Sequence, residues 1–373
     1  MRRKTNGRSA AQLALPPRPA HRRVRAHYEP VSFVSTPHAL GFRMPAEWEP
    51  HDATWIAWPH NAEDWPGRFE PIPWVFGEIV RKLSDVERVC ILTESEEIEA
   101  SASNILAKCG ANMAAIEFFR QPTDRIWARD FGPMFVRDAK GELAAVKWRF
   151  NGWAKYENHL LDEAAGHAIA GFKDIEVWTP DCVLEGGSID VNGAGLLITT
   201  EECLLSPVQA RNPDLTQAQI EAKLHEYLGV NRVLWLRNGI AGDDTHGHID
   251  DLARFTDPQS IVMVSEADPG DVNYEPLREN LAIAKGFSLR IRTLPMPAPL
   301  IFDGQRLPAS YANFYIANET VLVPAFNDPN DRIALDTLAE CFPDRRVIGI
   351  NCVEMVWGLG TLHCMTQQQP ASL

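Results

Sequence analysis

Residues 357–370 read Trp-Gly-Leu-Gly-Thr-Leu-His-Cys-Met-Thr-Gln-Gln-Gln-Pro, and this segment governs how the rest of the chain is interpreted. Its two glycines allow the backbone to turn and to approach other groups closely. A short apolar run leads to one cysteine, Cys364, and three glutamines and a proline follow. A hydrophobic core does not need such an amide-rich ending. The pattern favours a thiol held at the mouth of a site by a strand bordered by glycines.

A free cysteine is most often a small, buried hydrophobic residue. Cys364 is a better candidate for a functional residue than a random cysteine, because the rest of the chain supplies acids and a histidine that a cysteine nucleophile requires.

The composition narrows the function classes. The chain has 373 residues, of which 45% are hydrophobic and 23% charged, as is usual for globular proteins. The net charge of −14 argues against nucleic-acid or membrane binding and suits a cationic partner or substrate. Seven scattered cysteines without CxxC spacing indicate neither a disulfide framework nor a structural zinc site. A reducing, cytoplasmic setting is the simplest expectation.

The first forty residues differ from the rest. Eight arginines and lysines and no acid precede Glu29, and several prolines interrupt any helix. We expect residues 1–40 to be a disordered Arg-rich leader, or the result of a start codon placed too early, with organelle targeting as the alternative. Residues 41–373 are expected to form one catalytic α/β domain.

Several helices can be read directly from the sequence. Apolar spacing predicts helices over residues 72–83, 94–108 and 331–341. Thr216 and Gln219 form a capping box that opens a further helix, and Gly229 closes it.

From residue 129 onward one pattern recurs: a polar cluster opens a strand, a turn and a second apolar strand follow, and a helix comes next. The openers Asp130, Glu185, His248 and Asn313 are 55, 63 and 65 residues apart, and Cys364 follows after 51. Near-even spacing predicts repeats of one ββαβ-type unit. Arranged radially as a five-bladed β/α propeller around a pseudo-five-fold axis, such units would bring the openers to one centre.

Five groups could carry chemistry: Asp130, Glu185, His248, Asp250 and Cys364. Each of them alone is more often a turn, cap or structural residue. His248 and Asp250 are two residues apart, so on the expected strand they face the same side.

Two uses of these residues remain open. His246, His248 and Asp250 have spacing compatible with metal ligands. The more economical use is nucleophilic, with cysteine, histidine and carboxylates and without a metal. Papain-like proteolysis and glutamine amide transfer do not account for two additional carboxylates near the thiol. Two acids suit a planar guanidinium, which can donate to two carboxylates at once.

The sequence resembles the agmatine deiminase family, which belongs to the guanidine-modifying pentein superfamily. The resemblance covers about residues 41–370. It rests on five segments in the same order: Met-Pro-Ala-Glu-Trp (44–48), Trp-Ala-Arg-Asp-Phe-Gly-Pro (127–133), Glu-Gly-Gly (185–187), Gly-His-Ile-Asp (247–250) and His-Cys-Met-Thr-Gln-Gln-Gln-Pro (363–370). The resemblance implies the pentein five-bladed β/α propeller. It also implies hydrolysis of agmatine to N-carbamoylputrescine and ammonia, a step in putrescine and polyamine biosynthesis, without cofactor or metal.

The resemblance also implies residue roles. Cys364 resembles the nucleophile, His248 the general acid and base, and Glu185 the carboxylate that orients His248. Asp130 and Asp250 resemble the pair that grips the guanidinium.

Two further residues are expected to contact the substrate. Trp127 resembles an aromatic side chain of the substrate pocket, which suits a cation–π contact. Asp244 is a candidate partner for the distant ammonium of agmatine, and a plain turn residue is the alternative.

The sequence departs from the family pattern at Gly358-Leu359-Gly360-Thr361-Leu362, where many members have Gly-Gly-Gly-Asn-Ile, and at Phe131, where many have Thr. The alternatives are therefore deimination of peptidyl-arginine or another guanidine, or a non-enzymatic propeller that binds polyamines. The sequence leaves open whether the protein forms a homodimer.

Overall fold

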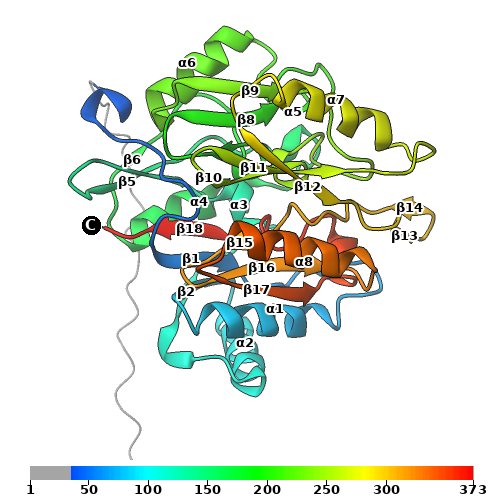
Figure 1. The fold of residues 1–373 in the computed structure, drawn as a ribbon. Helices are drawn as coiled ribbons and strands as arrows, with labels where there is room; N and C mark the ends of the chain where they lie inside the picture. The colour runs from blue at the N-terminus through cyan, green and yellow to red at the C-terminus, as the bar shows by residue number, and fades with distance from the viewer. Residues whose placement is uncertain (1–34, 373) are drawn as a thin grey trace, which may run out of the picture.

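The computed structural model describes residues 35–372 and has a mixed α/β fold (Figure 1). Most of the expected leader, residues 1–34, lies outside the described residues. Its last part contains the 3-10 helix η1 (His38–Leu40), where the ring of His38 lies 4.3 Å from that of His225. Contacts with the fold therefore begin before the expected boundary at residue 41.

Five sheets share one strand order. In each of them the first two strands are antiparallel, and the third runs parallel to the second. Four of the sheets have three strands each. One contains β4 (Met134–Arg137), β5 (Leu143–Val146) and β6 (Val177–Trp178), and the next contains β7 (Asp190–Val191), β8 (Leu196–Thr200) and β9 (Arg232–Leu236). The other two contain β10 (Ala253–Asp257), β11 (Ser260–Ser265) and β12 (Arg290–Pro295), and β15 (Tyr315–Ile316), β16 (Thr320–Ala325) and β17 (Arg346–Asn351). The four-stranded sheet contains β18 (Gln367–Pro370), β1 (His51–Ala57), β2 (Arg88–Thr93) and β3 (Ile116–Arg120). A separate hairpin joins β13 (Ile301–Phe302) and β14 (Gln305–Arg306).

Helices connect these strands, and the predicted ones are confirmed. They are α1 (Ile72–Leu83), α2 (Glu96–Cys109), α3 (Ala128–Phe131), α4 (Leu160–Phe172), α5 (Glu201–Leu204), α6 (Gln217–Leu228), α7 (Tyr274–Ala284) and α8 (Asn330–Cys341). The capping box at Thr216 begins α6, and Gly229 ends it with a φ of 70°. Glycine adopts this left-handed conformation without a steric cost, which is why the helix stops there.

The two ends of the described chain meet in one sheet. Strand β18 pairs with β1, and Figure 1 shows the red C-terminal strand beside the blue N-terminal one. The indole Nε1 of Trp55 donates to Gln369 Oε1 at 2.9 Å, and Gln367 Nε2 donates to the Pro133 carbonyl at 2.9 Å. The amide-rich ending is thus buried, and its amide groups bond to the elements on either side.

The predicted strand positions of the polar openers are wrong. Asp130 lies in the short helix α3, and Glu185 directly precedes the 3-10 helix η5 (Gly186–Ser188). Another 3-10 helix, η6 (Ile249–Asp251), has His248 as its N-cap and contains Asp250. Cys364 lies in a turn before β18. The other 3-10 helices are η2 (Ala62–Asp64), η3 (Met113–Ala115), η4 (Gly152–Ala154) and η7 (Met355–Gly358).

The reason is visible in the backbone before η6. Gly247 has a φ of 89° and His246 a φ of 66°, so the chain leaves the extended path directly before His248. The alternation of a strand therefore does not apply to His248 and Asp250, although both side chains still face the same buried space.

Two clusters of buried hydrophobic side chains fill the space between sheets and helices. The larger includes Trp55, Phe76 and Phe255, and it also contains Cys364. Among residues 35–372, no helix is long and apolar enough to cross a membrane.

Candidate active site

One cavity of about 420 Å³ opens beside several of the predicted residues. Its wall includes Cys364, Asp130, Trp127 and Asp244. Three further predicted residues, Glu185, His248 and Asp250, are at most 1% exposed. The structure places these buried groups next to the cavity wall, with Asp250 Oδ2 3.6 Å from the Cys364 sulfur and His248 Nδ1 3.9 Å from Asp130 Oδ1.

The Cys364 thiol lies between an amide and a carboxylate. Asn313 Nδ2 is 3.1 Å from the sulfur, and the sulfur is 3.6 Å from Asp250 Oδ2. Burial raises the pKa of Cys364 well above its usual value, and the carboxylates of Asp250, Asp251 and Asp130 raise it further. Without a bound cation, the thiol is therefore protonated at neutral pH.

Asp130 has both carboxylate oxygens engaged. Oδ1 accepts from the Gly187 backbone N–H at 3.0 Å, and Oδ2 accepts from the Trp153 indole N–H at 2.9 Å. His248 Nδ1 lies 3.9 Å from Oδ1. Burial raises the pKa of Asp130 to about 6, and neighbouring carboxylates add to the rise while His248 opposes it. The charged form therefore depends on nearby positive charge.

Asp250 has one oxygen bound and one free. Its Oδ2 accepts a hydrogen bond from His363 Nδ1 at 2.7 Å. Its Oδ1 is buried and has no hydrogen-bond partner among the residues that the structure describes. Burial alone would raise the pKa of Asp250, but the hydrogen bond and charge of His363 outweigh it and lower the pKa. Asp250 is thus a carboxylate with one unpaired oxygen next to the sulfur of Cys364.

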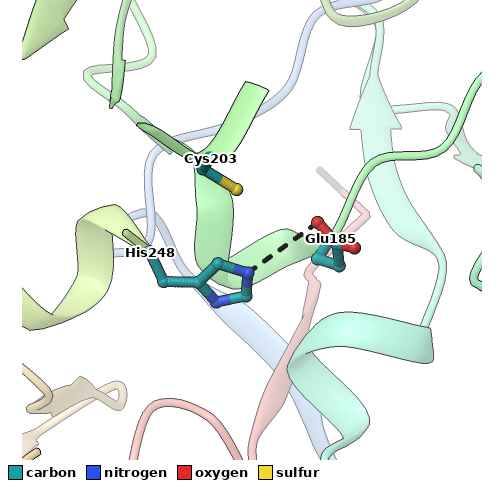
Figure 2. Close-up of side chains that lie close together, drawn as sticks. All are labelled: Glu185, Cys203 and His248. Atoms are coloured by element: carbon teal, nitrogen blue, oxygen red, sulfur yellow. Dashed lines mark ion pairs between the residues drawn. The ribbon is translucent and has the colours of Figure 1, made fainter. Parts of the chain in front are cut away.

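His248 points toward the carboxylate of Glu185 (Figure 2), and its other ring nitrogen faces Asp130. Its Nε2 is 3.8 Å from Glu185 Oε2, and Glu185 Oε1 accepts from Arg211 Nε at 3.0 Å. Burial would raise the pKa of Glu185, yet the charges of Arg211 and His248 lower it to about 2. Burial disfavours the imidazolium, but Asp130 and Glu185 hold the pKa of His248 well above its usual range. His248 is therefore cationic and able to give up a proton.

Gly187 explains the Glu-Gly-Gly motif. A Cβ at this position would lie 2.5 Å from His248 Nδ1, 2.8 Å from Asp130 Oδ1 and 3.1 Å from Asp250 Oδ2. Any side chain would collide with the groups that meet here. The glycine is therefore required for His248 and both aspartates to share one space.

Metal-ligating atom types also meet in this region. Glu185, Cys203 and His248 offer a carboxylate oxygen, a sulfur and a ring nitrogen within 4.8 Å of one another (Figure 2). Arg211 already supplies a positive charge to Glu185. A cation here would therefore have to compete with a buried guanidinium.

The alternative set of metal ligands suggested by the sequence is not brought together. His246 has a left-handed backbone and faces Ser206, with Nε2 3.2 Å from the hydroxyl, and Glu202, with Nδ1 3.7 Å from a carboxylate oxygen. Its ring therefore has partners away from those of His248 and Asp250.

The two predicted substrate-contact residues both line the cavity. Trp127 packs against Gly360, where a Cβ would lie 2.7 Å from the indole ring. Asp244 accepts from the Tyr156 hydroxyl at 2.6 Å and pairs with Lys155. Its carboxylate therefore faces the cavity but already has two partners within the protein.

Sequence reasoning missed Trp153 and underused Asn313. Trp153 has a φ of 57° inside η4 and lines the cavity while donating to Asp130. The available signal was an aromatic residue directly after Asn151-Gly152, a turn-forming pair. Asn313 was singled out only as an opener of a repeat, whereas its side chain contacts the Cys364 sulfur.

A buried charge cluster behind the site was also missed. Glu47 Oε2 accepts from Arg129 Nη2 at 3.1 Å and from His363 Nε2 at 2.9 Å, and Glu47 Oε1 pairs with Arg254 Nη2 at 2.9 Å. No local pattern indicates this cluster, because its members come from four distant segments.

The chain is similar in sequence and in fold to known proteins. Agmatine deiminase of Pseudomonas aeruginosa is 36% identical over 368 residues, which covers 91% of this chain and 98% of that protein. The solved structure of agmatine deiminase of Enterococcus faecalis is 33% identical with a TM-score of 0.84, covering 91% of this chain and 98% of that one. A C. jejuni agmatine deiminase structure with substrate bound is 31% identical with a TM-score of 0.82, covering 92% of this chain and 100% of that one.

One family model covers nearly the whole described domain. It matches residues 43–370, a range that includes every predicted site residue, from Trp127 to Cys364. The chain belongs to the Porphyromonas-type peptidyl-arginine deiminase family.

Proposed function

We propose that this protein hydrolyses agmatine to N-carbamoylputrescine and ammonia through a covalent intermediate on Cys364. The observation that carries the proposal is the Cys364 sulfur 3.6 Å from Asp250 Oδ2, with Asp130 in the same cavity wall. A thiol beside two buried carboxylates suits a cationic, electrophilic substrate. The names of similar proteins, agmatine deiminases of two bacteria, support agmatine as that substrate.

The guanidinium is held by charge and by aromatic rings. The unpaired Oδ1 of Asp250 accepts one N–H, and Asp130 accepts others through charge-assisted hydrogen bonds. Trp127 and Trp153 line the cavity and supply ring faces to a delocalised cation. The positive charge of the substrate favours the ionised form of Asp130, whose pKa is about 6 in its absence.

Substrate binding also activates the nucleophile. The protonated thiol of Cys364 is kept neutral by burial and by nearby carboxylates. A bound guanidinium offsets these negative charges, so the thiol loses its proton to solvent at a smaller cost. The thiolate therefore forms where its target carbon lies.

The remaining steps need only one proton donor and one water. The sulfur bonds to the guanidinium carbon, a C–N bond breaks, and the nitrogen leaves as ammonia with a proton from cationic His248. Neutral His248 then takes one proton from water, whose oxygen bonds to the carbon; the C–S bond breaks, and the second water proton goes to the departing sulfur, which restores the thiol. Glu185, itself held by Arg211, favours the imidazolium in each cycle.

Deimination of peptidyl-arginine is the second candidate, because the matching family carries that description. The cavity wall favours the smaller, dicationic substrate: it contains Asp64, whose Oδ2 has no hydrogen-bond partner among the described residues and suits a distant ammonium, and Asp244, which could bind the ammonium in exchange for Lys155. Burial raises the pKa of Asp64 to about 6, so it is mostly ionised at neutral pH.

The five sheets with one strand order also support a five-bladed propeller around a pseudo-five-fold axis, in which residues 41–373 form one catalytic domain. In that arrangement the segments that precede the first strands would meet at the axis, where we place the substrate.

The deciding experiment measures ammonia released by the purified protein from agmatine, arginine and a peptide with an internal arginine. We expect kcat/KM to be highest for agmatine. A preference for the peptide would replace the proposed substrate. Binding of agmatine without release of ammonia would instead identify a non-enzymatic polyamine-binding protein.

A further inference from the structure

His363 connects two buried carboxylates that otherwise have no contact with each other. Its Nδ1 lies 2.7 Å from Asp250 Oδ2, and its Nε2 lies 2.9 Å from Glu47 Oε2. The histidine is 2% exposed. Carboxylates only accept hydrogen bonds when ionised, so both ring nitrogens can donate only if His363 is an imidazolium.

The charges around the ring lead to the same conclusion. Glu47 faces Arg129 and Arg254, and Arg254 also faces Asp190 at 3.3 Å. With Asp250 added, three carboxylates face two guanidinium groups in a buried cluster. A cationic His363 brings the number of positive charges to three, which a buried cluster requires in order to avoid a large desolvation cost.

The backbone holds this ring in place. The His363 N–H donates to Asn313 Oδ1 at 3.0 Å, and Arg129 Nε donates to the His363 carbonyl at 3.3 Å. Asn313 also reaches the sulfur of the next residue, Cys364, through its Nδ2. The position of the ring and that of the nucleophile are therefore fixed by the same groups.

We propose that His363 is a positioning residue that acts through Asp250: its Nδ1–H binds Oδ2 and leaves Oδ1 as the only free oxygen for the substrate guanidinium. This inference rests on the proposed function, since it assigns a task to a carboxylate of that reaction. His363 itself does not touch the reacting atoms. Without it, Asp250 Oδ2 loses its donor at 2.7 Å, and the carboxylate is free to rotate.

Two amide variants separate this role from a merely structural one. The amide nitrogen of asparagine occupies about the position of histidine Nδ1, and that of glutamine about the position of Nε2. His363→Asn therefore keeps a donor toward Asp250 and loses the one toward Glu47. His363→Gln does the reverse. Both are neutral, so the loss of charge is the same in each.

We expect His363→Gln to have a kcat/KM for agmatine at least about tenfold below that of His363→Asn, the effect of one hydrogen bond to a charged group. In a Cys364→Ala background, the Gln variant should also bind an unreactive alkylguanidine at least about tenfold more weakly by calorimetry. Thermal unfolding of both variants serves as the control. Equal losses, or losses that follow the unfolding temperatures, would overturn the inference.

A measurement on the otherwise unaltered ring keeps the test decisive if a variant does not fold. Nuclear magnetic resonance of isotope-labelled histidine in Cys364→Ala protein should find protons on both nitrogens of His363. A ring without a proton on Nδ1 would contradict the inference. If wild-type protein releases no ammonia from any guanidine, the proposed function fails instead, and the alkylguanidine affinities still decide whether His363 positions Asp250.

Discussion

The substitution Asp130→Asn tests whether a guanidinium is the substrate. It preserves the shape of the side chain, removes one negative charge and replaces an acceptor oxygen with an amide donor. Truncating a buried, hydrogen-bonded charge of this kind costs about 2–5 kcal/mol in transition-state stabilisation. At about 1.4 kcal/mol for each factor of ten, kcat/KM for agmatine should fall roughly thirtyfold to several thousandfold.

Asp130→Asn should also lower the free energy of unfolding, because the structure shows two donors that depend on this carboxylate. Asp130 accepts from the Gly187 N–H and from the Trp153 indole N–H, and asparagine has only one acceptor oxygen. One of the two donors therefore loses its partner, at about 1–3 kcal/mol of unfolding free energy. Removal of a buried charge offsets part of this loss.

A double variant separates the two effects. Trp153→Phe keeps an aromatic wall but removes the indole donor, so Asp130→Asn in that background leaves no second donor unpaired. We expect the double variant to recover stability in thermal unfolding but not activity in ammonia release. Calorimetry of an unreactive guanidine in Cys364→Ala protein, with and without Asp130→Asn, completes the assay. Unchanged affinity together with kcat/KM within about threefold of wild type would refute guanidinium binding by Asp130.

Three further predictions address other parts of the protein. Cys364→Ser should fold normally and lose at least about a thousandfold in ammonia release, because a hydroxyl is a far weaker nucleophile than a thiolate. Mass spectrometry should detect a substrate-derived adduct on Cys364 in wild-type protein. An active serine variant would exclude the covalent route. Treatment with EDTA should leave activity unchanged, and loss of activity that zinc restores would instead support a metal-dependent reaction. Burial raises the pKa of Asp162 to about 8, so its ionisation favours the unfolded state, and the free energy of unfolding should fall as the pH rises from about 4 to 8. Asp162→Asn keeps an acceptor for the N–H groups of Asp124 and Arg125 and should reduce that fall. An equal dependence of unfolding free energy on pH in the two proteins would contradict the prediction.

Helices and helix caps, which depend on residues close together in the sequence, were predicted best. The helix predicted over residues 72–83 is α1 with the same ends, and the capping box at Thr216 begins α6. Periodicity and capping are local, so one segment is enough to reveal them. The regular spacing of Asp130, Glu185 and His248 likewise indicated groups that the structure brings together.

What the sequence could not predict depends on contacts between distant segments. Asp130 meets Trp153 through a left-handed backbone that no propensity favours in tryptophan. His363 meets Glu47 across 316 positions of the chain. Such partners follow only from the assembled sheets. The short helical turns at Asp130 and His248 were missed because a nearby glycine, Gly132 or Gly247, is compatible with both extended and turned backbones.

The pairing of β18 with β1 has a consequence for protein synthesis. Strand β1 can pair with β2 early, but Trp55 and Gln369 are 314 positions apart, so its other neighbour, β18, is synthesised much later. Long-range pairing of this kind is formed slowly, whereas the sheets in between need only nearby segments. The nucleophile arrives with the same late segment. A nascent chain therefore carries its carboxylates well before its thiol, and the assembly of the reactive centre coincides with closure of the fold.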